Sequence, residues 1–390
     1  MRLSAAGNIP IHLINKPDSL QESLQELARS PTISVDLEFD NNSYGYGVTL
    51  CLVQVATPAA CYIIDPLANL DLGGLYALFS DPNIQMLVHS PGEDLRLLHS
   101  LCCYPQNLFD TEIAARLLNY EKTSLTVMLQ EKLGVGMDKK LQRSNWLRRP
   151  LSEEQLLYAA EDVLWLHPLK EILLAEAAER NLLPFIQEEQ ELLDATRYPV
   201  SAKTTFLKPA DQYNLSPRDQ YILNELLRYR DELARELNRP PYQVMSEEMV
   251  KELAAGTRIP ESIIDSAGVH PRIKNSSIAN EFASRLEGAR KEAAAQQLPT
   301  EKTRAPRLTS DRQAAMRKAA DDKEKVFAPI QQALEQRLGS YAAKVILNNR
   351  VVNELLNCSI TLQDIKPVYR QELIREVATA AGISLKEYEC

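Results

Sequence analysis

The sequence has little of what a zinc site needs. Its 390 residues include only six cysteines and five histidines, and none of them forms a C-x-x-C pair or a Cys/His cluster of zinc spacing. Most of the cysteines lie in apolar runs, which is typical of buried thiols. Zinc ligation by cysteine and histidine is therefore not expected.

Long apolar runs and an excess of basic residues are also absent. No run approaches the length of a membrane span, and the first ten residues have no basic segment followed by an apolar one. We therefore expect a cytoplasmic protein with no membrane partner. The formal net charge of −9 argues mildly against a simple nucleic-acid binder, although local basic patches matter more than the sum.

The chain does have the composition of an ordinary globular protein, with 45% apolar and 25% charged residues. At 390 residues it is too long for one typical core, so two or three domains are expected. Short strand-type and helical runs alternate up to about Asp110, and the remainder has helical periodicity, which predicts a mixed α/β domain followed by helical ones. Aperiodic stretches at 198–216 and 296–309 are typical of linkers.

The predicted strands are 11–14, 33–39, 49–56, 61–65 and 84–89, and the predicted early helices are 18–29, 72–80 and 93–101. The close spacing of the second, third and fourth strands favours an antiparallel meander. The expected N-cap residues of four helices are Asp18, Asp110 or Thr111, Ser124 and Ser152. In the helical half, residues 236–253 resemble residues 337–355, which predicts two helical modules of similar design.

Two carboxylates lie on one face of the strand 33–39. Side chains alternate along a strand, so Asp36 and Glu38 share a face while apolar residues occupy the other. Two neighbouring carboxylates repel each other and resist burial unless a cation lies between them. A divalent metal site is one interpretation. An edge strand with a solvated acidic face is the other, and this stretch alone does not separate them.

Three further residues are candidates for the same site as the two carboxylates of this strand. Asp94 is expected in the first turn of a helix, where the helix dipole alone also favours a carboxylate. Tyr158 and Asp162 lie four residues apart and therefore share one helix face. Taken singly, each of the two is better explained without a shared site, as a core tyrosine and a surface aspartate.

Together, four carboxylates and a phenol have a chemical logic. Two divalent cations about 4 Å apart clamp the attacking and leaving oxygens of a phosphodiester, and magnesium-type cations prefer oxygen ligands. In this scheme Asp36 bridges the two cations, Glu38 and Asp162 complete one site, and Asp94 acts on the second. The Tyr158 hydroxyl orients the attacking water, whose pKa the metal lowers.

These residues, in this order, resemble the three motifs of the DEDDy 3′–5′ exonucleases. The matching phrases are Asp36-x-Glu38, then His89 followed by Gly-Glu-Asp94-Leu, then Tyr158-x3-Asp162. The phrases at 109–116 and 146–160 between them are similar to ribonuclease D in particular. The resemblance covers about residues 10–195, and the helical modules at about 213–293 and 311–388 are similar to HRDC domains.

The resemblance implies a ribonuclease H-like exonuclease domain at 1–197 and two HRDC-like helical domains at 213–295 and 311–390, with linkers at 198–212 and 296–310. It implies a metal-dependent exoribonuclease that uses two Mg²⁺ or Mn²⁺ ions. The implied substrates are RNAs with a free 3′ end, tRNA precursors among them, the products are 5′-monophosphates, and a monomer is expected. The rival interpretations are a 3′–5′ DNA exonuclease and a non-catalytic nucleic-acid-binding scaffold.

The sequence departs from the family pattern in two places. Asn145 stands where the family often has an acid, and the turn 44–48 lacks a proline that is common there. Neither position is an expected metal ligand, so catalytic competence is not put in doubt.

A basic run precedes the Tyr158 helix. It consists of Lys139, Lys140, Arg143, Arg148 and Arg149. Contact with RNA phosphates is one interpretation and a solvated loop is the other. Arg149 could equally be a structural ion-pair partner, since it stands directly before a proline. A second basic stretch, from Arg304 to Lys325, is more typical of a charged linker and helix face.

Overall fold

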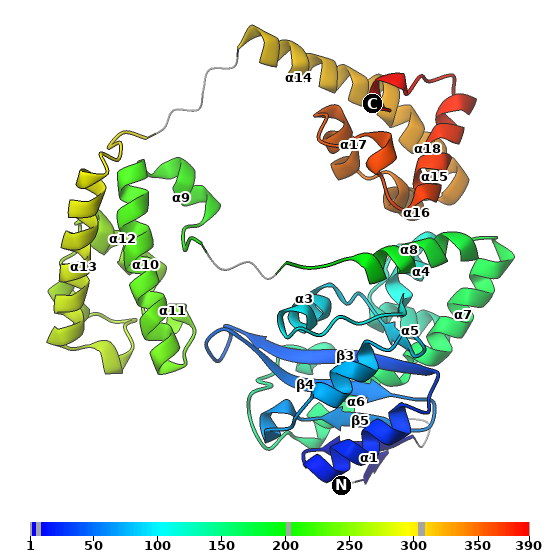
Figure 1. Cartoon of the computed structure of the whole chain (residues 1–390), viewed down its shortest axis with the longest axis horizontal. Helices are drawn as coiled ribbons and strands as arrows, with labels where there is room; N and C mark the ends of the chain where they lie inside the picture. Colours follow the sequence, from blue (N-terminus) through cyan, green and yellow to red (C-terminus); the bar gives the residue numbers. More distant parts are fainter. Residues whose placement is uncertain (1, 5–8, 200–203, 303–308, 390) are drawn as a thin grey trace.

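The computed structural model describes residues 2–4, 9–199, 204–302 and 309–389, which form a sheet domain followed by two helical modules (Figure 1). The sheet domain contains a seven-stranded sheet of order β1-β2-β5-β4-β3-β6-β7. Its strands are β1 (Arg2–Ser4), β2 (Pro10–Ile14), β3 (Thr32–Asn41), β4 (Val48–Ala56), β5 (Cys61–Ile64), β6 (Gln85–Val88) and β7 (Leu108–Asp110).

The sheet is mixed, as expected. Strands β3, β4 and β5 form the predicted antiparallel meander. The pairs β2–β5, β3–β6 and β6–β7 are parallel. The edge strands β1 and β7 were not predicted, because each has only three residues and shows no period of its own.

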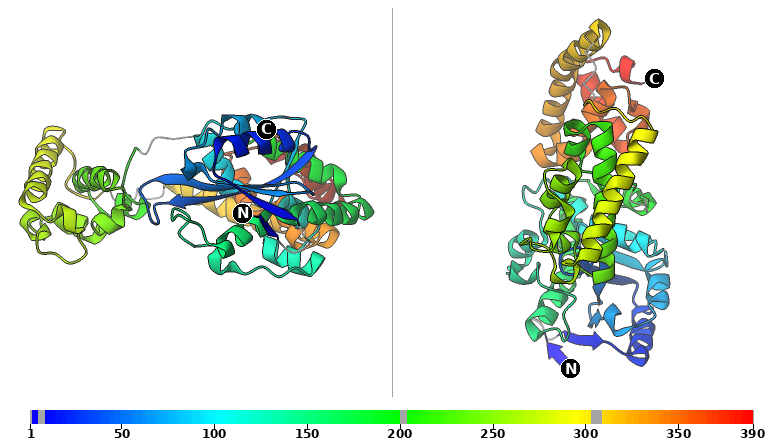
Figure 2. Two further views of the ribbon diagram at one scale, coloured as in Figure 1. Left: turned by 90° about the horizontal axis from the view of Figure 1, so that it is seen from below. Right: turned by 90° about the vertical axis from the view of Figure 1, so that its left-hand side faces the viewer.

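Helices cover both faces of the sheet (Figure 2). The helices of this domain are α1 (Pro17–Leu27), α2 (Gly73–Phe79), α3 (Gly92–Ser100), α4 (Thr111–Leu117), α5 (Leu125–Leu133), α6 (Glu153–Leu164), α7 (Leu166–Glu179) and α8 (Leu183–Ala195). Residues Ile33, Val35 and Leu37 of β3 pack into the core that α1, α2 and α3 share with the sheet. The opposite face of β3, β4 and β5 is covered by α6. The acidic face of β3 therefore lies on the α6 side.

The expected N-caps have mixed outcomes. Asp110 caps α4 and Ser152 caps α6, each through a side-chain hydrogen bond to the first turn. Ser124 occupies the N-cap position of α5 but makes no such bond. The prediction for Asp18 is wrong, because Pro17, whose fixed φ suits a first helical position, begins α1 and places Asp18 inside the helix.

The two helical modules repeat one order of elements. The first contains α9 (Pro209–Asn214), α10 (Pro217–Leu237), α11 (Pro241–Val244), α12 (Glu247–Ala255) and α13 (Ser276–Ala295). The second contains α14 (Ser310–Asp322), α15 (Ala328–Leu338), α16 (Ser340–Ile346), α17 (Asn349–Leu356) and α18 (Val368–Ala380). The stretches 236–253 and 337–355 both run from the end of a long helix through a short helix into a third, so the predicted similarity of design is confirmed at the level of element order.

The first module has a core of its own and meets the sheet domain at the tip of the β3–β4 hairpin (Figure 1). The hydroxyl of Tyr46 donates to Asp231 at 2.5 Å. The backbone N–H of Tyr46 donates to Asn238 at 3.2 Å, and the hydroxyl of Tyr242 donates to the carbonyl of Ser43 at 3.0 Å. The tip of the β3–β4 hairpin therefore connects the acidic strand β3 to this module.

The second module shares a continuous core with the sheet domain, where α16 lies against α4 and α18 against α8. The backbone N–H groups of Tyr341 and Ala342 donate to the Oδ1 atom of Asn119 at 2.7 and 3.2 Å. Asn119 approaches so closely that a Cβ atom at Gly339, whose φ is +93°, would lie 2.1 Å from it. Glycine is therefore required at 339.

A buried ion pair also joins the second module to the sheet domain. Arg370 of α18 binds Glu189 of α8 through two hydrogen bonds of 2.7 and 2.6 Å, and the two side chains are 16% and 5% exposed. The hydroxyl of Tyr369 donates to the same carboxylate at 2.5 Å. No helix in the described ranges combines the length and the apolar character of a membrane span.

The ion pair gives a prediction about stability. Replacing Arg370→Ala should lower the free energy of unfolding by about 3 kcal/mol, because it leaves the buried Glu189 carboxylate without its cation. The measurement is urea denaturation. The control is Arg337→Ala, whose partner Glu376 is 62% exposed and whose loss should cost about 1 kcal/mol or less. Equal losses in the two variants would contradict a special role for the buried pair.

Candidate active site

The five residues of the exonuclease-like motifs line one cavity of about 440 Å³. Asp36 and Glu38 come from β3, Asp94 from the first turn of α3, and Tyr158 and Asp162 from one face of α6. These elements lie up to 126 positions apart in the chain, from 36 to 162. The structure therefore brings together all five residues that the sequence singled out.

Three of the acids form a tight group. Asp36, Glu38 and Asp162 each offer a carboxylate oxygen, and these three oxygens lie within 4.8 Å of one another. Asp94 lies outside that group but faces the same cavity. All four side chains are half-buried, so they are partly removed from water and yet open to the cavity.

Burial and crowding make these carboxylates difficult to ionise. Burial raises the pKa of Asp36 to about 7. Burial, followed by repulsion from Asp36, Asp162 and Asp94, raises the pKa of Glu38 to about 10. The pKa values of Asp94 and Asp162 lie well above their usual range for the same two reasons, burial first and the Asp36 charge second. The protein alone therefore disfavours the charged form of this group.

The donor set fits a hard divalent cation. No lysine or arginine is among the described residues that line the cavity, so no side chain there neutralises the acids. Several carboxylate oxygens at short mutual distance are the ligands that Mg²⁺ and Mn²⁺ prefer. A cation would remove the repulsion that the protein leaves uncompensated.

The structure places more residues at the cavity than the motifs indicated. Ser90, Glu112, Ser124 and Gln142 also line it. Ser90 has a φ of +57°, which is uncommon for a residue with a side chain. Ser124 was expected as an N-cap and Glu112 lies in the phrase 109–116, but no sequence signal placed either residue at the cavity. Gln142 had no signal at all, because its loop comes to the cavity through tertiary contacts alone.

His89 also lines the acidic cavity and is held there by a side-chain contact. Its Nδ1 atom lies 2.8 Å from the hydroxyl of Thr111. Burial lowers the pKa of His89 to about 4, so the ring is neutral at ordinary pH. Trp146 is 3% exposed and belongs to the core.

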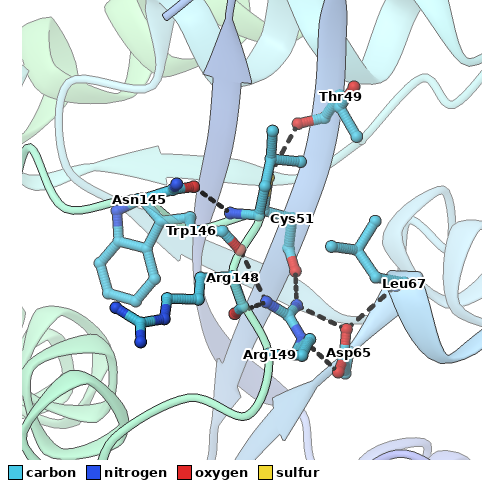
Figure 3. Close-up of polar contacts among 9 residues, drawn as sticks. Thr49, Cys51, Asp65, Leu67, Asn145, Trp146, Arg148 and Arg149 are labelled. Carbon is cyan, nitrogen blue, oxygen red and sulfur yellow. Dashed lines mark hydrogen bonds and ion pairs between the residues drawn. The ribbon is translucent and has the colours of Figure 1, made fainter. Parts of the chain in front are cut away.

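Arg149 takes the ion-pair alternative and not the phosphate contact (Figure 3). Its guanidinium forms two hydrogen bonds of 2.7 and 2.6 Å with Asp65. It also donates to the carbonyls of Trp146, Arg148 and Cys51 at 2.6, 2.9 and 2.8 Å. Every nitrogen of the Arg149 guanidinium is therefore hydrogen-bonded, and these bonds connect the segment before α6 to β4 and to the end of β5. We no longer expect Arg149 to contact RNA.

The other basic side chains of this run that the structure describes do not line the cavity. Lys140, Arg143 and Arg148 are exposed, and Lys140 pairs with Asp138 at 3.1 Å. The side chain of Lys139 lies outside the described part of the chain, as do Arg304 and Arg307 of the second basic stretch. RNA contact by the exposed residues stays a prediction.

A family model described as 3′-5′ exonuclease matches residues 11–178, and an HRDC domain model matches residues 219–261. A ribonuclease D from Xanthomonas oryzae is 35% identical over 271 residues, which cover 65% of this chain and 70% of that protein. One from Desulfotalea psychrophila is 32% identical over 263 residues, covering 66% and 70%. The chain belongs to the ribonuclease D family.

Solved structures agree with this assignment. The crystal structure of Escherichia coli RNase D, described as an exoribonuclease involved in structured RNA processing, superposes with a TM-score of 0.68 at 26% identity. The match covers 97% of this chain and 100% of that one. The catalytic core of RRP6 from Trypanosoma brucei gives a TM-score of 0.64 at 26% identity over 75% and 82% of the two chains. The HRDC model matches within the first helical module only, so a second HRDC domain is not confirmed.

The crowded carboxylates predict an unusual effect of Asp36→Asn. In metal-free protein this change should raise the melting temperature at pH 8 by several degrees, since it removes a charge that burial disfavours. Because the folded pKa is raised to about 7, the wild type should lose stability as pH rises from about 4, where the unfolded carboxyl titrates, to about 7. The variant should lack this contribution.

Added Mn²⁺ should make the melting temperature of the wild type higher than that of Asp36→Asn. It should raise the melting temperature of the wild type by ligand linkage and raise that of Asp36→Asn much less. Thermal denaturation with and without chelator measures both effects. The control Glu131→Gln removes an exposed acid of α5 and should change neither value. A wild type indifferent to Mn²⁺ would argue against a metal site here.

The ion pair between Arg149 and Asp65 gives a separate prediction. Arg149→Lys should lower the free energy of unfolding by about 2–4 kcal/mol, because one ammonium cannot replace a planar guanidinium paired at both ends. The salt dependence of RNA binding should stay unchanged. The neighbouring exposed Arg148→Ala should cost about 0.5 kcal/mol or less. An unchanged stability together with a weaker salt dependence in Arg149→Lys would restore the phosphate contact.

Proposed function

We propose that this protein is a metal-dependent 3′–5′ exoribonuclease that removes nucleotides from RNA 3′ ends and releases 5′-monophosphates. The observation that carries the proposal is the convergence of four carboxylates and a tyrosine, in the order of the exonuclease motifs, on one cavity. Membership of the ribonuclease D family supports RNA as the polymer.

We propose two Mg²⁺ or Mn²⁺ ions as cofactors. Asp36, Glu38 and Asp162 would hold one ion through their grouped oxygens, and Asp94, across the same cavity, would serve the second together with Asp36. When bound, such ions neutralise charge on the phosphodiester and make water a better nucleophile. Their number and identity are part of the proposal.

The protein's own contribution to the reaction is positioning. The β3 strand holds Asp36 and Glu38 at the spacing of one pleat, and α6 presents Tyr158 and Asp162 on one face opposite them. Burial, then the nearby acids, raises the pKa of Tyr158, so its hydroxyl keeps its proton. A protonated phenol both donates and accepts hydrogen bonds, which suits it to orient a water molecule beside the scissile bond.

We propose structured RNAs, tRNA precursors among them, as natural substrates and a monomer as the working form. We also propose a domain division at 1–197, 213–295 and 311–390, although α9 spans the boundary at 212. The second module is proposed as a divergent HRDC-like domain, because its helices follow the same order as those of the first.

A substrate panel tests the activity. A 3′-extended tRNA, an unstructured RNA and a single-stranded DNA of matched length are incubated with Mg²⁺ or Mn²⁺, and the products are sized. We expect stepwise shortening of the RNAs from the 3′ end. Faster shortening of the DNA would favour the DNA exonuclease, and binding without shortening would favour the scaffold.

Asp94→Asn separates catalysis from binding. It should slow RNA shortening about a thousandfold or more, since a lost cation ligand costs several kcal/mol of transition-state stabilisation. The affinity for RNA should stay within about threefold, because the phosphate backbone dominates binding. The matched control is Glu93→Gln, the preceding acid of the same turn, whose side chain is 73% exposed. A variant at Asp94 that shortens RNA at the wild-type rate would refute the mechanism.

A further inference from the structure

A second cavity adjoins the acidic one. It has a volume of about 460 Å³ and lies where α4 of the sheet domain faces α16 and α18 of the second helical module. Residues that line it include Arg116, Tyr120, Thr123, Tyr341, Lys344 and Asn348. We call it the interdomain cavity. None of the five motif residues is among the described residues that line it.

The two cavities share a wall. Glu112 lines the acidic cavity, and its carboxylate accepts hydrogen bonds from Arg116 at 2.8 Å and from Thr123 at 2.9 Å. Arg116 and Thr123 line the interdomain cavity, while the next residue, Ser124, lines the acidic one. Lining residues of the two cavities are therefore in direct contact.

The interdomain cavity, unlike the acidic one, is lined by basic as well as acidic side chains. In the interdomain cavity, Glu189 is neutralised by Arg370. The Glu121 carboxylate accepts a hydrogen bond from the hydroxyl of Tyr341 and keeps its charge. Lys344 is exposed and has no ion-pair partner among the described residues. Its Nζ atom lies 5.3 Å from the centroid of the Tyr341 ring. An exposed ammonium over the ring of a half-buried tyrosine thus lies next to a pocket of carboxylates.

We propose that the interdomain cavity binds the single-stranded RNA that precedes the 3′-terminal nucleotide. Lys344 contacts a backbone phosphate, and the ring of Tyr341 offers a surface on which a base stacks. Proteins grip single strands with this combination of cation and aromatic ring. The inference rests on the proposed function, since it assumes that the scissile phosphodiester lies in the acidic cavity.

Substrate length tests the inference. Lys344→Ala should raise the KM for a single-stranded RNA octamer about fivefold, because one phosphate contact is lost. The slope of log KM against log salt should fall by about 0.7, the value for one neutralised phosphate of a single strand. The kcat, and all constants for a dinucleotide too short to cross the wall, should stay unchanged. Tyr341→Ala should also raise the octamer KM, whereas Tyr341→Phe keeps the ring and should not.

The matched control is Lys386→Ala, which removes another exposed lysine of the same module away from the interdomain cavity. It should leave the octamer KM unchanged. Wild-type protein that hydrolyses neither RNA would overturn the proposed function. Wild-type hydrolysis of both, with Lys344→Ala equal to wild type or to Lys386→Ala on the octamer, would overturn only the inference.

Discussion

Repulsion among carboxylates that are held close together is the constraint on which this molecule depends. One pleat of β3 fixes Asp36 and Glu38 on the same face, and α6 brings Asp162 within 4.8 Å of both. Partial burial makes the repulsion stronger, because the cavity screens charge less than bulk water does. Nothing in the described lining offsets it. The surrounding structure must therefore hold the acids together until a cation binds.

Apolar packing and a few hydrogen bonds hold the acidic elements together against this repulsion. Helix α6 presses Leu156, Ala159 and Val163 against the sheet. The hydroxyl of Ser34, two residues before Asp36, donates to the carbonyl of Val163 at 2.8 Å, one residue after Asp162. A single hydrogen bond thus joins the two acidic elements beside the site itself. Arg149 fixes the approach to α6 from the other end, which makes the site rigid before any ligand arrives.

Local spacing determines which parts of the site were predictable from the sequence. The strand and helix periods placed Asp36 with Glu38 and Tyr158 with Asp162, because those relations hold within one element. That β3 and α6 meet came only from the family resemblance. The role of Arg149 depended on its distance to Asp65, and Gln142 enters the cavity from an irregular loop. Both follow from tertiary packing, which no periodicity records.

The helical half shows the same limit at a larger scale. The internal repeat predicted two modules of similar design, and their element order agrees, but their surroundings differ. The first module closes a core around its own helices, while Phe327, Ile330 and Tyr369 of the second pack into a core shared with α4, α7 and α8. An internal repeat predicts the order of helices within a module but not the elements against which the module packs. Because the second module packs against the sheet domain, the two together line the interdomain cavity, a placement that the sequence of the module alone did not indicate.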